Sequence, residues 1–294
     1  MKFLLSLLIL TFSLPVLSDS LSLYFIESPL GINWKSPWSM TMSTLKSQVA
    51  PTKKKNAHSI SHTYAEIDCS STGTFLLRGM TSITNDEERE LIFKKKYGLG
   101  VIFHTFKGRL EKNQDLSRDL QDYWGDKRTS KLTIKISPKT CQRLVDYAEE
   151  YEAKGYGLMY SGLQADPLKG EGAGCSAFSV SFLRVGGLMQ PFVEKWKDII
   201  DVPLKLVGGP LTNQKVPITK LLRSVKTKWS SKVPHIHLEA WNPERMHDWL
   251  LKAHKQYPDG ELSEFSPTID QYRDSKILTL DMEDLPTPEG SFWL

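Results

Sequence analysis

Cysteine is scarce in this sequence of 294 residues, which has only Cys69, Cys141 and Cys175. Three cysteines are too few to define a small disulfide-rich scaffold. Their number is also odd, so in an oxidising compartment one thiol is left over. A Cys69–Cys141 bridge with Cys175 free is one of three pairings, and the sequence does not choose among them.

A strong excess of charge is also missing, because 38 Lys and Arg face 34 Asp and Glu, for a formal net charge of +4. This mild balance would suit an anionic envelope polymer but does not indicate nucleic-acid binding. The composition, 40% hydrophobic and 24% charged, is that of a globular protein and excludes a low-complexity chain. After the first residues no run is long and apolar enough to span a bilayer.

The first residues are the exception to this lack of apolar runs. Lys2 is followed by an apolar run from Phe3 to Leu17, and the small residues Val16 and Ser18 suit cleavage after Ser18. The run is shorter than the roughly 20 residues of a membrane span. This pattern predicts a secretory signal peptide at residues 1–18 and a periplasmic or secreted protein with no membrane span in its mature form.

A β-hairpin is the clearest local signal. SHTYAEIDC, residues 61–69, alternates between an apolar face and a polar face that includes His62 and Tyr64. The turn cluster SSTG follows, and TFLLRGMT, residues 74–81, is expected to return as the second strand. In this register Cys69 pairs with Thr74, and Thr81 lies opposite His62.

The rest of the chain mixes helices and strands in an order that favours an α+β fold. Residues 19–57 are expected to be irregular, 84–96 a capped helix or lid, and the last thirty or so residues extended and peripheral. Strands are expected at 99–106, 131–136 and 233–241. Helices are expected from Pro138 and over 243–257, from Pro near the first turn and apolar residues at helical spacing.

Cys175 follows the glycine-rich loop GEGAG and precedes SAFSVSFL. If a helix begins at Cys175, its free N–H groups and dipole would stabilise a thiolate, and Phe178 and Phe182 would fall on one buried stripe. The alternation of Phe and Val with Ser is equally typical of a strand, which would remove this effect. Periodicity alone leaves both interpretations open, and a lone cysteine is usually structural.

A nucleophilic cysteine needs a base, and His62 on the polar strand face is the candidate. Glu66 shares that face but lies roughly 13 Å along the strand, too far to orient the imidazole. A third polar residue must therefore come from a neighbouring strand, and Thr81 and His104 are the two candidates.

SHTYAEI, the later YGLMY and GAGCSAF together resemble the circularly permuted branch of the NlpC/P60, papain-like superfamily, in which the strand histidine precedes the cysteine. They are similar in particular to the lacto-N-biosidase-associated N-terminal periplasmic domain family. Gly174 stands where that family typically has Asn. The resemblance covers residues 59–187 and implies an antiparallel sheet packed on a cysteine-bearing helix. It also implies a core at 58–190. Because no Pro/Ser/Gly linker follows this core, 191–294 are expected to be a C-terminal α+β extension packed on it.

Carried over, the resemblance makes Cys175 the nucleophile and His62 the base of an exported cysteine-dependent hydrolase or acyltransferase. An amidase-like or peptidase-like enzyme of this kind would act on an amide or ester of the cell envelope, such as a peptidoglycan peptide. The Cys175 N–H would bind the oxyanion, and no cofactor is expected.

Two alternatives remain open. In HIHLEAW, residues 235–241, His235 and His237 share a strand face and could bind zinc in a metal-dependent hydrolase, with His247 or His104 as a third ligand. Alternatively, the chain is a non-catalytic envelope-binding domain in which Cys175 is structural.

Overall fold

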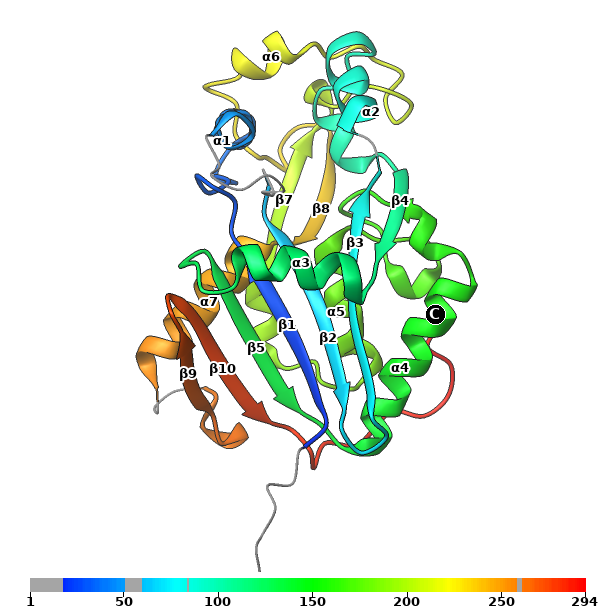
Figure 1. The fold of residues 1–294 in the computed structure, drawn as a ribbon. Helices are drawn as coiled ribbons and strands as arrows, with labels where there is room; N and C mark the ends of the chain where they lie inside the picture. The colour runs from blue at the N-terminus through cyan, green and yellow to red at the C-terminus, as the bar shows by residue number, and fades with distance from the viewer. Residues whose placement is uncertain (1–17, 51–59, 84, 258–260) are drawn as a thin grey trace, which may run out of the picture.

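The computed structural model describes residues 18–50, 60–83, 85–257 and 261–294 (Figure 1). The signal peptide expected at residues 1–18 therefore lies almost entirely outside the described residues. Within them, no helix is both long enough and apolar enough to cross a bilayer.

A mixed sheet of eight strands forms the centre of the molecule. All neighbouring strands run antiparallel except β10 and β5, which are parallel. A separate antiparallel pair, β7 (Lys197–Pro203) with β8 (His235–Trp241), lies beside the upper end of this sheet (Figure 1). In spatial order the strands of the large sheet are β6 (Met159–Tyr160), β4 (Phe106–Glu111), β3 (Thr74–Ser82), β2 (His62–Cys69), β1 (Ser20–Ile26), β5 (Thr129–Lys135), β10 (Ser275–Asp281) and β9 (Thr268–Tyr272).

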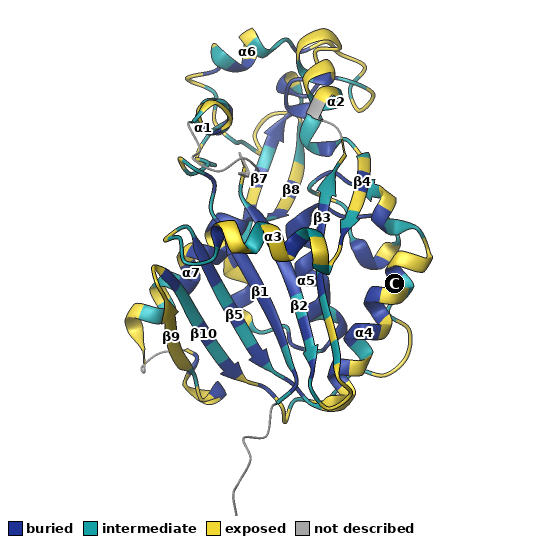
Figure 2. Cartoon of the chain, in the orientation of Figure 1, coloured by how far each residue is buried: buried dark blue, intermediate teal, exposed yellow. Residues whose placement is uncertain are grey.

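Helices cover both faces of the sheet, as expected for an α+β protein. Helices α4, α5 and α7 share the largest hydrophobic cluster with one face, and α3 packs on the other face through Leu116 and Tyr123. The dark blue of Figure 2 marks the strands between these layers as buried. The helices are α1 (Pro37–Val49), α2 (Asn85–Arg89), α3 (Asn113–Tyr123), α4 (Pro138–Ala153), α5 (Cys175–Val185), α6 (Ile218–Leu222) and α7 (Pro243–Gln256).

The N-terminal segment was expected to be irregular, but it contains a strand and a helix. Strand β1 lies between β2 and β5, and its side chains Leu21, Leu23 and Phe25 are fully buried in the main cluster. Residues 37–49 then form α1, which begins with a capping box between Ser36 and Ser39. The apolar alternation in SLSLYFI is the signal that marks a strand here.

The C-terminal region also departs from the expected peripheral extension. Strand β10 pairs with β5, and Leu278 and Leu280 are buried in the main cluster. Strands from 19–57 and 191–294 therefore complete the sheet that the sequence assigned to residues 58–190. The boundaries of that expected core do not coincide with those of the sheet.

Residues 99–106 form no continuous strand. A 3-10 turn at Leu99–Phe103 precedes β4, which begins only at Phe106. Gly98 has φ +52°, and a Cβ at Gly100 would lie 2.1 Å from the Gly208 carbonyl oxygen. This close approach of the 206–209 backbone bends the chain and delays the strand.

Several other local expectations are confirmed, but the helix expected at 84–96 is a short α2 followed by a π-helix at Glu90–Lys94 with no side-chain cap. The hairpin register runs from Tyr64 opposite Gly79 to Cys69 opposite Thr74. Helix α4 begins at Pro138 with the Ser137 hydroxyl accepting the Thr140 N–H, and α7 begins at Pro243. A disulfide joins Cys69 at the end of β2 to Cys141 in the first turn of α4, so Cys175 is the free cysteine.

Candidate functional site

Cys175 is the first residue of α5, so the segment after it is a helix and not a strand. The alternation of Phe and Ser resembled that of a half-exposed strand, but this helix is buried on all sides, so its Ser residues are buried as well. Ser179 and Ser181 are both fully buried and hydrogen-bonded, Ser179 to Thr63 of β2 at 3.0 Å and Ser181 to the hydroxyl of Tyr147 at 2.7 Å. A thiol at this helix start lies near free N–H groups and the positive end of the helix dipole.

The loop before Cys175 needs its glycines. Gly170 and Gly172 have φ values of +71° and +72°, which side chains rarely adopt. A Cβ at Gly172 would also lie 2.6 Å from Met159. The loop therefore packs tightly against β6 and brings the start of α5 beside Tyr160.

His62 is the first residue of β2, and its side chain is only 4% exposed. Its ring contacts the Tyr64 ring edge-to-face, with centroids 4.7 Å apart, as expected for two side chains on one strand face. Hydrogen bonding and charge link His62 to Cys175, and the Thr63 backbone N–H also donates to the sulfur. The structure thus brings together the two residues that the sequence proposed as base and nucleophile.

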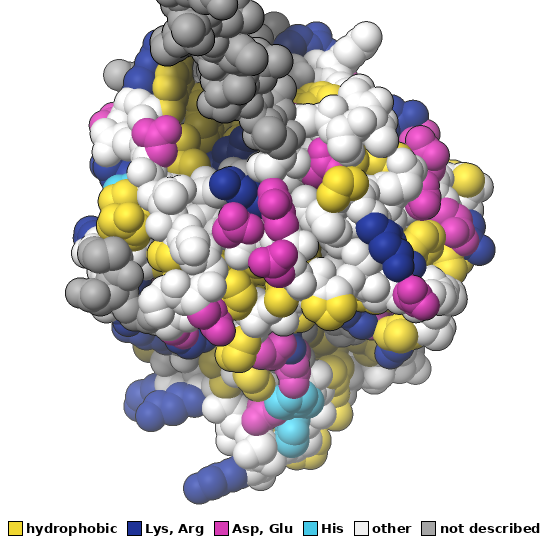
Figure 3. All heavy atoms as spheres, turned by 90° about the horizontal axis from the view of Figure 1, so that it is seen from below, with side chains coloured by type: hydrophobic (Ala, Val, Ile, Leu, Met, Phe, Trp, Pro, Cys, Tyr) yellow, Lys and Arg dark blue, Asp and Glu magenta, His cyan; other side chains and the backbone are white. Residues whose placement is uncertain are grey.

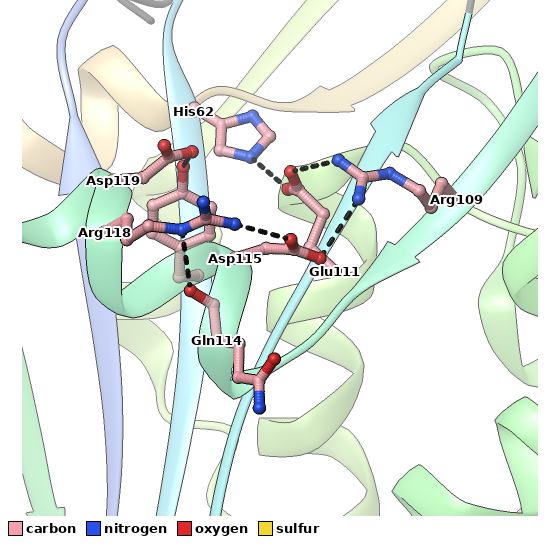
Figure 4. Close-up of polar contacts among 8 residues, drawn as sticks. His62, Arg109, Glu111, Gln114, Asp115, Arg118 and Asp119 are labelled. Carbon is pink, nitrogen blue, oxygen red and sulfur yellow. Dashed lines mark hydrogen bonds and ion pairs between the residues drawn. The ribbon is translucent and has the colours of Figure 1, made fainter.

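Glu111 is the polar residue that the sequence did not identify. Its Oε2 lies 3.6 Å from His62 Nε2, and both side chains are about 95% buried (Figure 4). The distance is slightly beyond an ordinary hydrogen bond, as is common for unliganded sites. Since Nε2 faces Glu111, the other ring nitrogen, Nδ1, is left for the thiol.

A glycine on the intervening strand lets Glu111 reach His62. Glu111 is on β4, two strands away from β2, and it pairs with Gly79 of β3. Gly79 in turn pairs with Tyr64. A Cβ at Gly79 would lie 2.7 Å from the Tyr64 ring and 3.3 Å from Glu111 Oε2. The missing side chain opens the path across β3.

The sequence suggested Thr81 or His104 as the third polar residue of the site, and in the structure both have other partners. Thr81 pairs with Arg109 of β4, beyond the last β2–β3 pair at Tyr64 and Gly79. His104 Nε2 lies 3.4 Å from Glu87, and its ring packs on Phe106. The side chains that shift the pKa of His62 are Cys175 and Glu111.

Electrostatics favour an ion pair between cysteine and histidine. Burial alone would lower the pKa of His62, but the charge of Cys175, a hydrogen bond to Cys175 and the nearby Glu111 carboxylate raise it to about 10. Burial would raise the pKa of Cys175, yet His62, the Thr63 N–H and the Tyr160 hydroxyl together lower it. These opposite shifts favour transfer of the thiol proton to His62 and so a thiolate beside an imidazolium.

Tyr160 adds a hydroxyl at the sulfur. Its Oη lies 3.9 Å from Cys175 Sγ as a donor, and the Cys175 backbone N–H donates to the same hydroxyl. Burial, followed by the charge of Cys175, raises the pKa of Tyr160 well above its ordinary value, so the hydroxyl keeps its proton. It can donate to an anion on sulfur or on a substrate oxygen.

Side chains of α3 and β4 surround the carboxylate (Figure 4). Arg109 lies 3.5 Å from Glu111 and 3.0 Å from Asp115, and Asp119 accepts a hydrogen bond from the Tyr64 hydroxyl at 3.4 Å. Arg109 thus holds Glu111 from the side away from His62. Glu111 is oriented between a cation and an imidazole.

The histidines proposed as metal ligands form a different group. His237 Nδ1 lies 2.8 Å from Asp201 of β7, and His235 Nε2 lies 3.6 Å from the same oxygen. His247 is buried and bonded to Ser130 instead. Across the residues described, no group of three or more His, Cys, Asp or Glu side chains is arranged to hold a metal ion.

Comparisons of the chain with protein-family models, with curated proteins and with solved structures found no match.

Proposed function

We propose that this chain is a cysteine-dependent hydrolase or acyltransferase of the papain-like, permuted NlpC/P60 kind. Cys175 is its nucleophile, His62 its base and Glu111 the positioning carboxylate. The observation that carries the proposal is the position of His62 between a cysteine at a helix start and a buried carboxylate. Three elements distant in sequence supply these side chains, as is typical of a nucleophile–base–orienter set.

The reaction begins with attack of the Cys175 thiolate on the carbonyl carbon of an amide or ester. The backbone N–H of Cys175 and the Tyr160 hydroxyl, which contact each other in the free protein, are the donors for the oxyanion. The His62 imidazolium then gives its proton to the leaving amine or alcohol, and the carbon–heteroatom bond breaks. A thioester remains on Cys175.

The second half releases the acyl group. Neutral His62 takes a proton from water, or from another acceptor, which attacks the thioester carbonyl. Collapse of the tetrahedral intermediate expels the Cys175 thiolate, and the proton stays on His62. Glu111 stabilises the imidazolium in both halves and keeps Nδ1 directed at the reacting atoms.

We further propose that the protein is exported and acts on a cell-envelope amide or ester, such as a peptidoglycan peptide. The apolar start of the sequence and the family resemblance support this proposal.

The test is digestion of isolated peptidoglycan fragments and of small acyl esters by the purified chain, followed by mass spectrometry. We expect released fragments and a transient acyl adduct on Cys175, with no activity in Cys175→Ala. Activity that survives in a folded Cys175→Ala variant would refute the proposal, and loss of activity with a chelator would favour the metal-dependent alternative. A folded protein that binds fragments and never cleaves them would favour the binding domain.

A further inference from the structure

The segment between β7 and β8, which includes α6, has charged side chains of one sign. Between Asp201 and Glu239 the chain has seven Lys and Arg and no acidic residue, although the totals of 38 and 34 nearly balance. The basic residues of α6 and the segment after it are all exposed. Among the described residues none of them forms an ion pair with a carboxylate. They are Lys220, Arg223, Lys226, Lys228 and Lys232.

Helix α1 extends this basic surface. It packs against α6, and the Trp229 indole donates to the Trp34 carbonyl at 2.6 Å. From Ser28 to Ala50 the chain has Lys35 and Lys46 and no acidic residue. Figure 1 places α1 and α6 together at the top of the molecule. We define the α1–α6 surface as residues 34–49 and 218–233.

Apolar side chains lie among these cations. Val49 is 81% exposed, Val225 60% and Val233 42%. Trp34 and Trp229 are half-buried at the same surface. Tryptophan and exposed aliphatic residues mixed with Lys and Arg are typical of protein surfaces that lie at a membrane–water interface. A surface for a soluble polyanion needs the cations alone.

The opposite end of the molecule differs. Seen from below in Figure 3, acidic and basic side chains are interspersed on that face. The α1–α6 surface differs from this face, because its sequence segments contain Lys and Arg and no acidic residue.

We propose that the α1–α6 surface binds an anionic phospholipid bilayer. Its Lys and Arg side chains contact the lipid phosphates, and Val49, Val225 and Val233 enter the boundary with the acyl chains. The binding goes beyond the proposed hydrolysis and does not depend on Cys175. Each basic residue near such a surface strengthens binding by about fivefold, and salt weakens the attraction.

The test is co-flotation of the full chain with vesicles of phosphatidylcholine alone and of phosphatidylcholine with phosphatidylglycerol. We expect binding to the anionic vesicles only, weakened by high salt. The double variant Lys226→Gln, Lys228→Gln should bind roughly 20-fold more weakly. The matched double variant Lys252→Gln, Lys255→Gln on α7 loses the same charge away from the surface and should bind normally.

A second pair of variants separates a bilayer from a soluble polyanion. Val49→Ser with Val225→Ser should weaken vesicle binding several-fold and leave retention on heparin unchanged. Both positions are exposed, so the thermal melt should stay the same. Equal binding to neutral vesicles, no binding to anionic vesicles, or vesicle binding that the valine changes leave intact would overturn the proposal.

Discussion

Strands β2 and β8 begin with the same pattern of side chains. Each starts with a histidine, has a second ring two residues later and a glutamate two residues after that, as His62-Thr-Tyr64-Ala-Glu66 and His235-Ile-His237-Leu-Glu239. In β8 the partners are local, since Asp201 and Glu239 lie on the same two strands and His237 is more than half exposed. In β2 the partners of the buried His62 come from α5 and β4.

The difference shows what turns a histidine strand into a candidate catalytic site. Glu66 does not orient His62, because it accepts hydrogen bonds from Tyr24 and Lys131 at 2.8 Å each. The partners of His62 are instead the Glu111 carboxylate, from two strands away, and the Cys175 thiol at the start of α5. Low exposure strengthens these interactions, whereas water screens those of His237.

The largest expected effect is on Cys175. Cys175→Ala should lower hydrolysis by at least roughly 10⁴-fold, because no other group can form the acyl intermediate. The double variant His235→Ala, His237→Ala should retain activity within about twofold, because both side chains are outside the proposed site. Initial rates on the same substrate compare them. An active Cys175→Ala variant or an inactive His235→Ala, His237→Ala variant would contradict this prediction.

The second effect is on the base. His62→Ala should lower hydrolysis by about 10²–10⁴-fold and raise the pKa of the Cys175 thiol, because the imidazolium no longer stabilises the thiolate. His237→Ala is the matched control, and its rates should equal those of the parent protein. Rates measured from pH 5 to 9 check this. Equal losses in the two variants would show that histidine on β2 has no special role.

The third effect is on the carboxylate. Glu111→Gln should lower hydrolysis by roughly 10²-fold, and Glu239→Gln should not. Glu111 helps to raise the pKa of His62 to about 10, so its loss lowers that pKa. Activity needs the imidazolium and is lost as pH rises through this pKa, and the alkaline limb of the profile should therefore move to lower pH. An unmoved limb would remove Glu111 from the site.

The smallest expected effect is on β3, the strand between β2 and β4. Gly79→Ala would place a Cβ 2.7 Å from the Tyr64 ring, and we expect a loss of about 1–3 kcal/mol in the free energy of unfolding together with several-fold slower hydrolysis. Gly174→Ala is the control, because there is room for a Cβ at this position and the nearest atom to it would be 3.7 Å away. Thermal melts and initial rates measure both. Identical behaviour would show that the path across β3 is not needed.

Short-range signals in the sequence predicted short-range structure. The hairpin register and the helices from Pro138 and Pro243 all depend on residues close in the chain. The central place of β1 and the parallel pairing of β10 depend on strands more than a hundred residues apart. No local pattern specifies such pairings.

Glu111 was missed for a physical reason. The strand was expected at 99–106, and a carboxylate at 111 then falls outside it. Its position beside His62 depends on the β3–β4 register and on the missing side chain at Gly79, which are properties of three strands together. The glycine opposite Tyr64 in the predicted hairpin was the available signal, because a missing side chain there leaves room for a neighbour.

The most direct measurement of the central claim is the pH dependence of Cys175 alkylation by iodoacetamide, followed by mass spectrometry of the labelled peptide. With Cys69 and Cys141 joined in a disulfide, Cys175 is the only free thiol. We expect labelling that sets in at a pH below the ordinary thiol pKa of about 8.5, and in His62→Ala we expect the onset to move to higher pH. Labelling at or above that pKa, or labelling that His62→Ala leaves unchanged, would contradict it.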